Sequence, residues 1–329
     1  MASINYSPVA FRGKAADPLI GEILFLNTTI ANSLVSFEED IKSSTIFTES
    51  INTVSMQAYT CGAPSAGGTM SLYDTEITPV KVMFYDEFCD ETLRPSRFNR
   101  SMKPGAWNII SDEWNRGVLQ NIGATIAQDL DSKFWNGSTS ATKVAIAATV
   151  SGVSANEMAY VAASPLTLFD GVVTRMIYNG GVVGGRTAVT ATASITSTNI
   201  AIEYGRLYAA APAVLFNENT SGEMPYIYAP KSHKQLINIY NTNATYRDLF
   251  SKEGENYYYN GVQIQFVPLA ENTMILCLPS SIVMCTDLLS DINEVKIDKL
   301  QANADTRFYK VVFTMFAHVV RQNKITLYK

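Results

Sequence analysis

The chain has 329 residues, of which 47% are hydrophobic and 17% are charged, and its formal net charge is −5 at pH 7. This acidic balance argues against a dedicated nucleic-acid-binding protein, which would carry a basic face, and against membrane adhesion through basic residues. No apolar run approaches the ~18 residues of a membrane-spanning helix, and residues 1–14 lack the pattern of a secretory signal. The charged fraction lies below the roughly 25% usual for soluble proteins. Burial of surface in an oligomer would explain it, and so would an ordinary apolar core.

The first 42 residues lack the periodicity of a packed element. Small, polar and turn residues fill 1–17, and the mixed segment that follows ends in the acidic run Phe37-Glu38-Glu39-Asp40. We therefore predict an N-terminal arm over residues 1–42, with the acidic run exposed to solvent.

Residues 43–92 have the composition of a long β-hairpin. Strand-forming residues dominate 46–59 and 77–85, and the segment CGAPSAGGTMS (61–71) between them is rich in turn residues. A projecting hairpin of this length cannot bury both faces on its own body, so the pattern predicts that a partner or another element covers it.

Acidic residues and then basic residues follow the hairpin. Arginines recur every third residue at Arg94, Arg97 and Arg100, after the acidic pair Asp86 and Glu87. Guanidinium groups at such spacing suit phosphates, but prolines within the segment would break the aligning helix, and the neighbouring acids compete for the same arginines. We favour salt bridges within or between subunits for these five residues.

The most regular pattern in the chain lies between Asp112 and Phe134. Apolar residues recur every fourth position at Trp114, Val118, Ile122, Ile126, Leu130 and Phe134. This spacing predicts a helix capped by Ser111 and closed by a left-handed residue at Asn136-Gly137. Because each step of four advances about 40° past a full turn, the two ends should bury nearly opposite faces.

The remaining sequence alternates between strand and helix patterns. Ala- and Thr-rich stretches at 138–155 and 186–199 predict short strands, and helical spacing occurs in three segments, 166–177, 199–208 and 231–240. Strand patterns follow at 261–267, 274–278 and 281–285, and residues 308–329 predict one long strand or a pair. The pattern belongs to the α+β class.

The sequence offers no credible constellation for catalysis, a metal ion or a cofactor. It lacks the GxSxG, GxxxxGK[ST] and GxGxxG motifs, and it contains only two histidines. We expect His233 to be exposed or to cap a helix, and His318 to be a satisfied, partly buried imidazole. The four cysteines form no CxxC pair and are predicted to be buried apolar residues without disulfides. We predict that the protein is not an enzyme.

Three consecutive tyrosines, Tyr257, Tyr258 and Tyr259, could stack on bases or sugars. In a strand their side chains would alternate between faces, which favours packing at a sheet edge or at a contact between subunits.

The order of these elements resembles the major capsid proteins of tailed bacteriophages, which share the Hong-Kong-97-type fold. The segments that carry the resemblance are IAQDLDSKFWNG (126–137), YIYAPKSHKQLINIY (226–240), NGVQIQFVPL (260–269) and CTDLLSDINEVKI (285–297). The resemblance implies an N-terminal arm (1–42), an extended loop hairpin (43–92) that lies over a neighbouring subunit, a peripheral domain (93–159) with a spine helix (112–136), an axial domain (160–300) and a C-terminal strand (301–329) that returns to the peripheral domain.

The same resemblance implies a function. Such subunits assemble into pentamers and hexamers of an icosahedral head that encloses double-stranded DNA without reading its sequence. Scaffold, portal and possibly decoration proteins are the implied partners, with assembly in the host cytoplasm and a final location in the virion. The chain shows no long charged helical extension at its N-terminus, so a separate scaffold, or a cleaved segment, is implied, and Met1 favours the separate scaffold.

Three alternatives remain open from the sequence. An encapsulin-like nanocompartment shares the fold but encloses an enzyme cargo. A tail or surface structural protein would also use β-rich arms. An enzyme of unknown type is disfavoured because the chain lacks a recognisable constellation.

Overall fold

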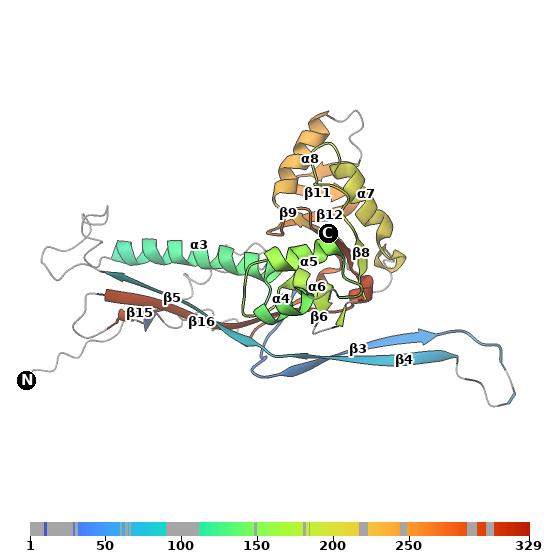
Figure 1. Cartoon of the computed structure of the whole chain (residues 1–329), viewed down its shortest axis with the longest axis horizontal. Coiled ribbons are helices and arrows are strands. Elements are labelled where there is room, and N and C mark those ends of the chain that lie inside the picture. The colour runs from blue at the N-terminus through green and yellow to red at the C-terminus, as the bar shows by residue number, and fades with distance from the viewer. Residues whose placement is uncertain are drawn as a thin grey trace, which may run out of the picture.

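The structure is a computed structural model, and it describes residues 10–11, 29, 32–59, 61–62, 65, 67–89, 112–147, 150–179, 182–183, 185–216, 223–243, 249–287, 295–300 and 306–329. Figure 1 shows three parts: a flat layer in which a long helix lies along a sheet, a second sheet with helices that rises above one end of this layer, and a hairpin that projects beyond the body.

Helices of the described residues occupy the flat layer, its junction with the upper part, and the upper part itself. They are α3 (Asp112–Asn136), α4 (Ser140–Ala147), α5 (Ala155–Ala163), α6 (Val172–Ile177), α7 (Ile200–Ala210) and α8 (Ser232–Asn243), with short 3-10 turns η4 (Ala213–Phe216), η5 (Pro279–Ser281) and η7 (Gln322–Lys324).

The sheet of the flat layer is organised around its longest strand, β16 (Thr306–Val319). The strand order is β1 (Ala10–Phe11), β15 (Val295–Lys299), β16, β14 (Ile282–Cys285) and β2 (Ser36–Glu38), and β5 (Val80–Cys89) also pairs with β16. Thr306–Met315 of β16 pair with β5, and Phe316–Val319 pair with β14. One strand therefore runs from the helix-covered sheet to the base of the hairpin.

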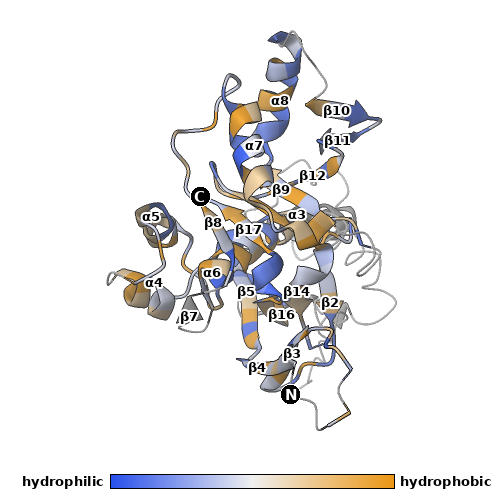
Figure 2. Cartoon of the chain, turned by 90° about the vertical axis from the view of Figure 1, so that its right-hand side faces the viewer, coloured by the Kyte–Doolittle hydropathy of each residue, from blue (hydrophilic) through white to orange (hydrophobic). Residues whose placement is uncertain are grey.

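The second sheet has seven strands and forms the upper part of Figure 1. Its order is β10 (Phe250–Glu253), β11 (Asn256–Tyr259), β12 (Val262–Val267), β9 (Tyr226–Pro230), β13 (Met274–Cys277), β17 (Thr326–Tyr328) and β8 (Thr187–Val189). A further small ladder joins β6 (Tyr178–Asn179) to β7 (Val182–Val183). Residues of α7 and α8 share an apolar core with this sheet, separate from the core of the flat layer. Figure 2 shows the same helices stacked beside the strands in the turned view.

The end of α3 joins the two parts through one asparagine. The Asn136 amide nitrogen donates to the carbonyl oxygens of Ser132 (3.1 Å) and Pro268, and its amide oxygen accepts from the Tyr160 hydroxyl (2.9 Å) and from the Ala270 backbone N–H (2.9 Å). These bonds tie the spine helix, α5 and the loop after β12 together. Polar groups buried at this junction are thereby satisfied, which is what burial requires.

Several predicted elements are confirmed. The spine helix is α3, the helices expected at 199–208 and 231–240 are α7 and α8, and the strands expected at 261–267, 274–278 and 281–285 are β12, β13 and β14. Ile126, Leu130 and Phe134 of the apolar stripe are buried. The other half of that stripe lies outside the described side chains, so the expected change of buried face along the helix stays a prediction.

The prediction of short strands at 138–155 is wrong, because this segment forms α4 and the start of α5. Capping interactions explain the difference. Ser154 and Glu157 form a reciprocal capping box at the start of α5. At the start of α4, the Asp170 carboxylate accepts from the Thr139 N–H (2.7 Å) and the Thr142 hydroxyl (2.7 Å). In the second Ala- and Thr-rich stretch, 186–199, only β8 is a strand.

Two further predictions need correction. The helix expected over 166–177 covers only Val172–Ile177. The left-handed closure of the spine helix is also wrong, because neither Asn136 nor Gly137 has a positive φ. Glycine is needed at 137 for another reason: a Cβ there would lie 2.6 Å from the Lys133 carbonyl oxygen and 2.7 Å from the Thr167 hydroxyl.

Candidate assembly surfaces

The predicted hairpin is confirmed, with a correction to its second strand. β3 (Thr45–Val54) and β4 (Gly68–Ile77) pair antiparallel over ten residues, a length of about 33 Å. The strand-forming run at 77–85, expected to return along the hairpin, instead begins β5 after Pro79 and pairs with β16. Proline cannot donate to a ladder, so Pro79 suits the break between the two strands.

One side of the hairpin ladder carries exposed apolar residues, with Ile46 near the base and Leu72, Met70 and Val54 in the outer half. Ile46, Leu72, Met70 and Val54 lie on the same side of the ladder, because residues that alternate along a strand and pair directly across it share a face. Their exposed fractions are 61%, 60%, 67% and 90%. We call these four side chains the apolar hairpin face. Thr53 and Thr69 occupy the opposite side, where their hydroxyls are 2.7 Å apart. The described chain leaves this amphipathic ladder uncovered.

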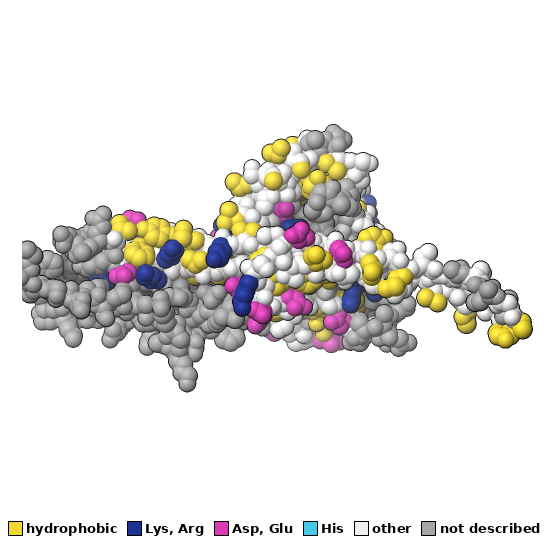
Figure 3. All heavy atoms as spheres, turned by 90° about the horizontal axis from the view of Figure 1, so that it is seen from below, with side chains coloured by type: hydrophobic (Ala, Val, Ile, Leu, Met, Phe, Trp, Pro, Cys, Tyr) yellow, Lys and Arg dark blue, Asp and Glu magenta, His cyan; other side chains and the backbone are white. Residues whose placement is uncertain are grey.

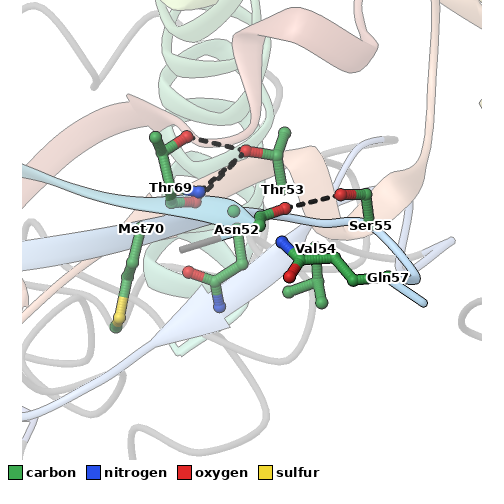
Figure 4. Close-up of a pocket in the computed structure, with 9 residues that line it drawn as sticks. Asn52, Thr53, Val54, Ser55, Gln57, Thr69 and Met70 are labelled. Atoms are coloured by element: carbon green, nitrogen blue, oxygen red, sulfur yellow. Dashed lines mark hydrogen bonds between the residues drawn. The ribbon is translucent and has the colours of Figure 1, made fainter. Parts of the chain in front are cut away.

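The tip of the hairpin is held by local hydrogen bonds rather than by packing. The Ser55 hydroxyl donates to the Gly67 carbonyl oxygen at 2.6 Å, and the Thr53 and Thr69 side chains meet beside it (Figure 4). A Cβ on Gly68 would lie 2.0 Å from the Thr53 carbonyl oxygen, so glycine permits this close approach. An open hollow of about 600 Å³ lies next to these residues, with Asn52, Val54, Gln57 and Met70 among its lining side chains. None of its lining residues carries a charge.

The base of the hairpin is anchored on the body. Ile77 is fully buried, and the Phe47 ring lies 5.1 Å from the His318 ring of β16. The Glu49 carboxylate accepts the backbone N–H of Arg321 at 2.7 Å. The hairpin is thus fixed at its root and free over its outer length, as Figure 1 shows.

The charge of the hairpin is entirely acidic. Between residues 43 and 80 the only charged side chains are Glu49, Asp74 and Glu76, and lysine and arginine are absent. Asp74 and Glu76 lie on the same side of the ladder: Glu76 is opposite Ile46, and Asp74 lies between Glu76 and Leu72 along β4. That side therefore combines apolar and negatively charged groups.

The flat layer carries a complementary surface on the side of the sheet away from α3. Phe84 and Phe313 stack at 5.9 Å on the covered side, so the alternate residues of β5, β15 and β16 point the other way. They include Lys81, Met83, Tyr85, Lys296, Lys310 and Val312, together with the acidic residues Glu87 and Asp298, and we call this side the outer sheet face. Met83, Tyr85 and Val312 are 54%, 43% and 38% exposed. In the view from below, Lys and Arg side chains lie among apolar ones on this part of the molecule (Figure 3).

The acidic members of the predicted salt-bridge cluster lie on β5. Asp86 is opposite Tyr309 and Glu87 is opposite Phe308 in the ladder. The Glu87 carboxylate accepts from the Tyr85 hydroxyl, and burial together with Asp86 raises the pKa of Tyr309. Arg94, Arg97 and Arg100 lie outside the described residues, so their ion pairs stay a prediction.

The three tyrosines of β11 differ in role, as strand alternation predicts. Tyr257 and Tyr259 are buried within the subunit, where their hydroxyls donate to the Asn238 side chain (3.0 Å) and the Ala201 carbonyl (3.3 Å). These two side chains therefore pack within their own subunit, and a contact of either tyrosine with another subunit stays a prediction. Tyr258 points to the other side and is half-buried, so its contact with another subunit stays a prediction.

His233 differs from expectation in its burial, and His318 differs in its hydrogen bonding. His233 is buried rather than exposed: its Nδ1 lies 3.1 Å from the Tyr204 hydroxyl, and burial lowers its pKa to about 4. His318 is buried as expected, but neither ring nitrogen has a hydrogen-bond partner in the described part of the chain. Cys277 and Cys285 are buried free thiols as predicted, whereas Cys61 is exposed near the hairpin tip.

The described residues contain no group of three or more His, Cys, Asp or Glu side chains placed to hold a metal ion. No helix among them is long and apolar enough to cross a bilayer.

Comparison with solved structures identifies the fold. The chain is similar to a subunit of the Myoviridae phage XM1 capsid (TM-score 0.55, 9% identity, 99% of this chain and 94% of that chain). It is similar to a chain of the satellite phage P4 procapsid (TM-score 0.53, 8% identity, 94% and 97% covered) and to the capsid of the native GTA particle (TM-score 0.53, 12% identity, 99% and 93% covered). No family model and no curated protein sequence matches the chain.

These matches define the class of fold. Each extends over nearly the whole of both chains, so the protein has the mixed α and β fold of phage capsid subunits, as the order of its sequence elements predicted. The division into arm, peripheral and axial domains stays a prediction.

Proposed function

We propose that this chain is the major capsid protein of a tailed bacteriophage, a structural subunit that assembles into the pentamers and hexamers of an icosahedral head around double-stranded DNA. The observation that carries the proposal is the capsid fold over nearly the whole chain, combined with a projecting hairpin whose apolar face is not covered by the described residues. Exposed apolar surface of this kind marks an interaction site.

The hairpin supplies the contact between copies in this proposal. The apolar hairpin face and its neighbours Asp74 and Glu76 match the outer sheet face in apolar character, and on that sheet face three lysines outnumber the two acidic residues Glu87 and Asp298. Lysines on that sheet face (Lys81, Lys296, Lys310) complement the acidic residues of the hairpin. Because the hairpin points away from its own sheet, the occupant of the sheet face is the hairpin of another copy (Figure 1). Complementary charge fixes register and rejects wrong partners.

The proposed contents, partners and location follow from the proposed function as a capsid protein. The subunit carries net charge −5 and would enclose DNA without sequence-specific contacts. Scaffold, portal and decoration proteins are its proposed partners, and the virion is its proposed location after assembly in the host cytoplasm.

Electron microscopy of the purified full-length protein tests the function. We expect closed shells, or capsomers that close when a scaffold is supplied. Closed particles that hold an enzyme cargo would move the assignment to a nanocompartment, and open tubes would move it to a tail protein.

A charge exchange tests the proposed contact. Asp74→Lys with Glu76→Lys should reduce assembly, because like charges would then face each other, and so should Lys81→Glu with Lys310→Glu. Combining the four substitutions should restore assembly toward the wild-type yield. Exposed residues away from both surfaces, Glu253 and Lys231, provide matched controls when reversed. If the combined variant assembles no better than either pair alone, this pairing of surfaces is wrong even where shells still form.

A further inference from the structure

His318 occupies the place where the hairpin meets the body, and it lacks the contacts that a buried imidazole needs. The residue lies near the end of β16 and is 1% exposed. Neither Nδ1 nor Nε2 has a hydrogen-bond partner among the described residues. Buried polar groups without partners are rare in folded proteins, and each calls for an explanation.

Each element around His318 contributes a different group. From the hairpin, the Phe47 ring packs on the imidazole at 5.1 Å, and Glu49 accepts the Arg321 N–H beyond it. From β14, apolar Val283 lies opposite in the ladder. From α6, the Arg175 guanidinium lies 4.4 Å over the ring of Phe316, two residues before His318 on the same face of β16.

Among the described residues, no carboxylate hydrogen-bonds the imidazole, and the charged group that acts on it is Arg175. The Glu49 carboxylate accepts from the Arg321 backbone, and Asp170 accepts from Thr139 and Thr142 and interacts with Arg175. The Cys285 thiol of β14 stays neutral in acid, because burial raises its pKa to about 12. The nearby cation is Arg175, whose charge opposes a second positive charge.

We propose that His318 makes the docking of the hairpin base sensitive to acid: the imidazole is neutral while Phe47 covers it, and its protonation releases the hairpin root from the body. A charged imidazolium beside Arg175, without an acceptor for its two N–H groups, is favoured only when the ring reaches water. The inference concerns one subunit and does not depend on the shell function.

Linkage between protonation of His318 and docking of the hairpin base gives the direction and size of the pH effect. Burial, and then the charge of Arg175, lower the pKa of His318 to about 4 in the docked junction, from 6.5 in water. The detached state therefore binds more protons as the pH falls, so docking is at full strength above pH 6.5 and weakens between pH 6.5 and 4. Between pH 7.5 and 5 the docking constant should fall about 30-fold.

Two measurements on the full-length protein test the proposal. The chain has only two histidines, so their ring-carbon NMR signals can be assigned with His318→Phe and followed through a pH titration. Hydrogen–deuterium exchange then reports on peptides 45–50 and 319–322, corrected for the intrinsic rate at each pH. We expect His318 to titrate well below 6.5 and both peptides to exchange faster at pH 5 than at pH 7.5, while strands β9 and β13 stay protected.

Variants separate His318 from other titrating groups. His318→Phe keeps an aromatic ring against Phe47 but cannot be protonated, so the increase in exchange should disappear. Glu49→Gln should weaken the anchor at both pH values and keep the acid response. An acid response that survives in His318→Phe, or that vanishes in Glu49→Gln, would overturn the proposal. If His318→Phe fails to fold, His233→Gln assigns the two signals instead, and a His318 pKa at or above 6.5 in the wild-type protein would also overturn the proposal.

Discussion

Two adjacent residues at the end of the spine helix perform separate tasks. Asn136 supplies hydrogen bonds to three segments, whereas Gly137 supplies space. The Gly171 N–H donates to the Gly137 carbonyl oxygen at 2.8 Å, and a Cβ on Gly171 would lie 2.7 Å from the Gly137 nitrogen. The start of α6 therefore approaches the end of α3 at backbone-to-backbone distance.

This close approach predicts that side chains at either glycine destabilise the subunit. Gly137→Ala and Gly171→Ala should each lower the free energy of unfolding by about 1–3 kcal/mol, because the backbones must separate to admit a methyl group. Gly185→Ala is the matched control, since nothing lies within 4 Å of a Cβ there, and its effect should stay within about 0.5 kcal/mol. Denaturant unfolding measures all three, and equal stability of the three variants would contradict the argument.

A buried ion pair is a second place where the fold depends on single side chains. Glu157 of α5 pairs with Arg186 just before β8, and both side chains are almost completely buried. Glu157 also accepts the Ser154 N–H at 2.8 Å as part of the capping box. One carboxylate therefore serves both a helix start and the connection between α5 and the second sheet.

At the scale of elements, the spine helix was predictable, and α5 has a local start signal in the capping box of Ser154 and Glu157, whereas α4 has no such local signal. The spine repeats an apolar residue every fourth position, a signal carried by its own sequence. Residues 138–155 hold mostly Ala, Thr and Val, whose propensities leave helix and strand close in free energy. Formation of the helix α4 depends on Asp170, which caps its start from a distant position in the chain.

The candidate surfaces were predictable in kind but not in detail. Composition indicated a hairpin with an unburied face, yet only the register shows that Ile46, Leu72, Met70 and Val54 share a side. Alternation predicted that Tyr257 and Tyr259 point together, but not that α7 and α8 cover that side. The unsatisfied state of His318 depends on the position of Arg175 and Phe47, which its own sequence neighbourhood does not encode.

The hairpin predicts a separation of folding from assembly. Deleting residues 60–70 should leave the subunit folded and impair closed shells, but that deletion also removes the first three residues of β4. Replacing 55–67 by Asn-Gly is sharper, because a two-residue turn suits a β-hairpin. We expect the free energy of unfolding to change by less than about 0.5 kcal/mol and the yield of closed shells to fall.

A length control separates reach from side-chain chemistry. A flexible Gly/Ser segment in place of 55–67 keeps the reach of the hairpin and removes its tip side chains, including Met56 and Tyr59. Wild-type particles from the Asn-Gly variant in size-exclusion chromatography would show that the tip is dispensable.

For the whole molecule, the arrangement separates a firmly built body from an exposed extension. Core residues lie in two clusters, one that joins the flat layer to one side of the upper sheet and one on the other side of that sheet, and the outer half of the hairpin belongs to neither. Such an arrangement leaves apolar surface that the described residues do not bury, which suits repeated moderate contacts summed over many copies.

Electrostatics at this scale can be tested through the predicted arginine cluster. Reversing Arg94, Arg97 and Arg100 together to Glu should impair assembly and change its dependence on salt, because ion pairs between exposed groups are screened. Reversal of Lys231 serves as the single-site control. Unchanged assembly and unchanged salt dependence in the triple variant would remove these arginines from the contact between subunits.

The pairing of β8 with β17 at one edge of the upper sheet constrains when that sheet can be completed. β8 (Thr187–Val189) pairs, among the described strands, only with β17 (Thr326–Tyr328). A ribosome must polymerise the intervening sequence, including β9 to β16, before β8 meets its partner. During translation the nascent chain therefore carries an incomplete second sheet. Pairing of β8 cannot be completed until residue 328 has been synthesised.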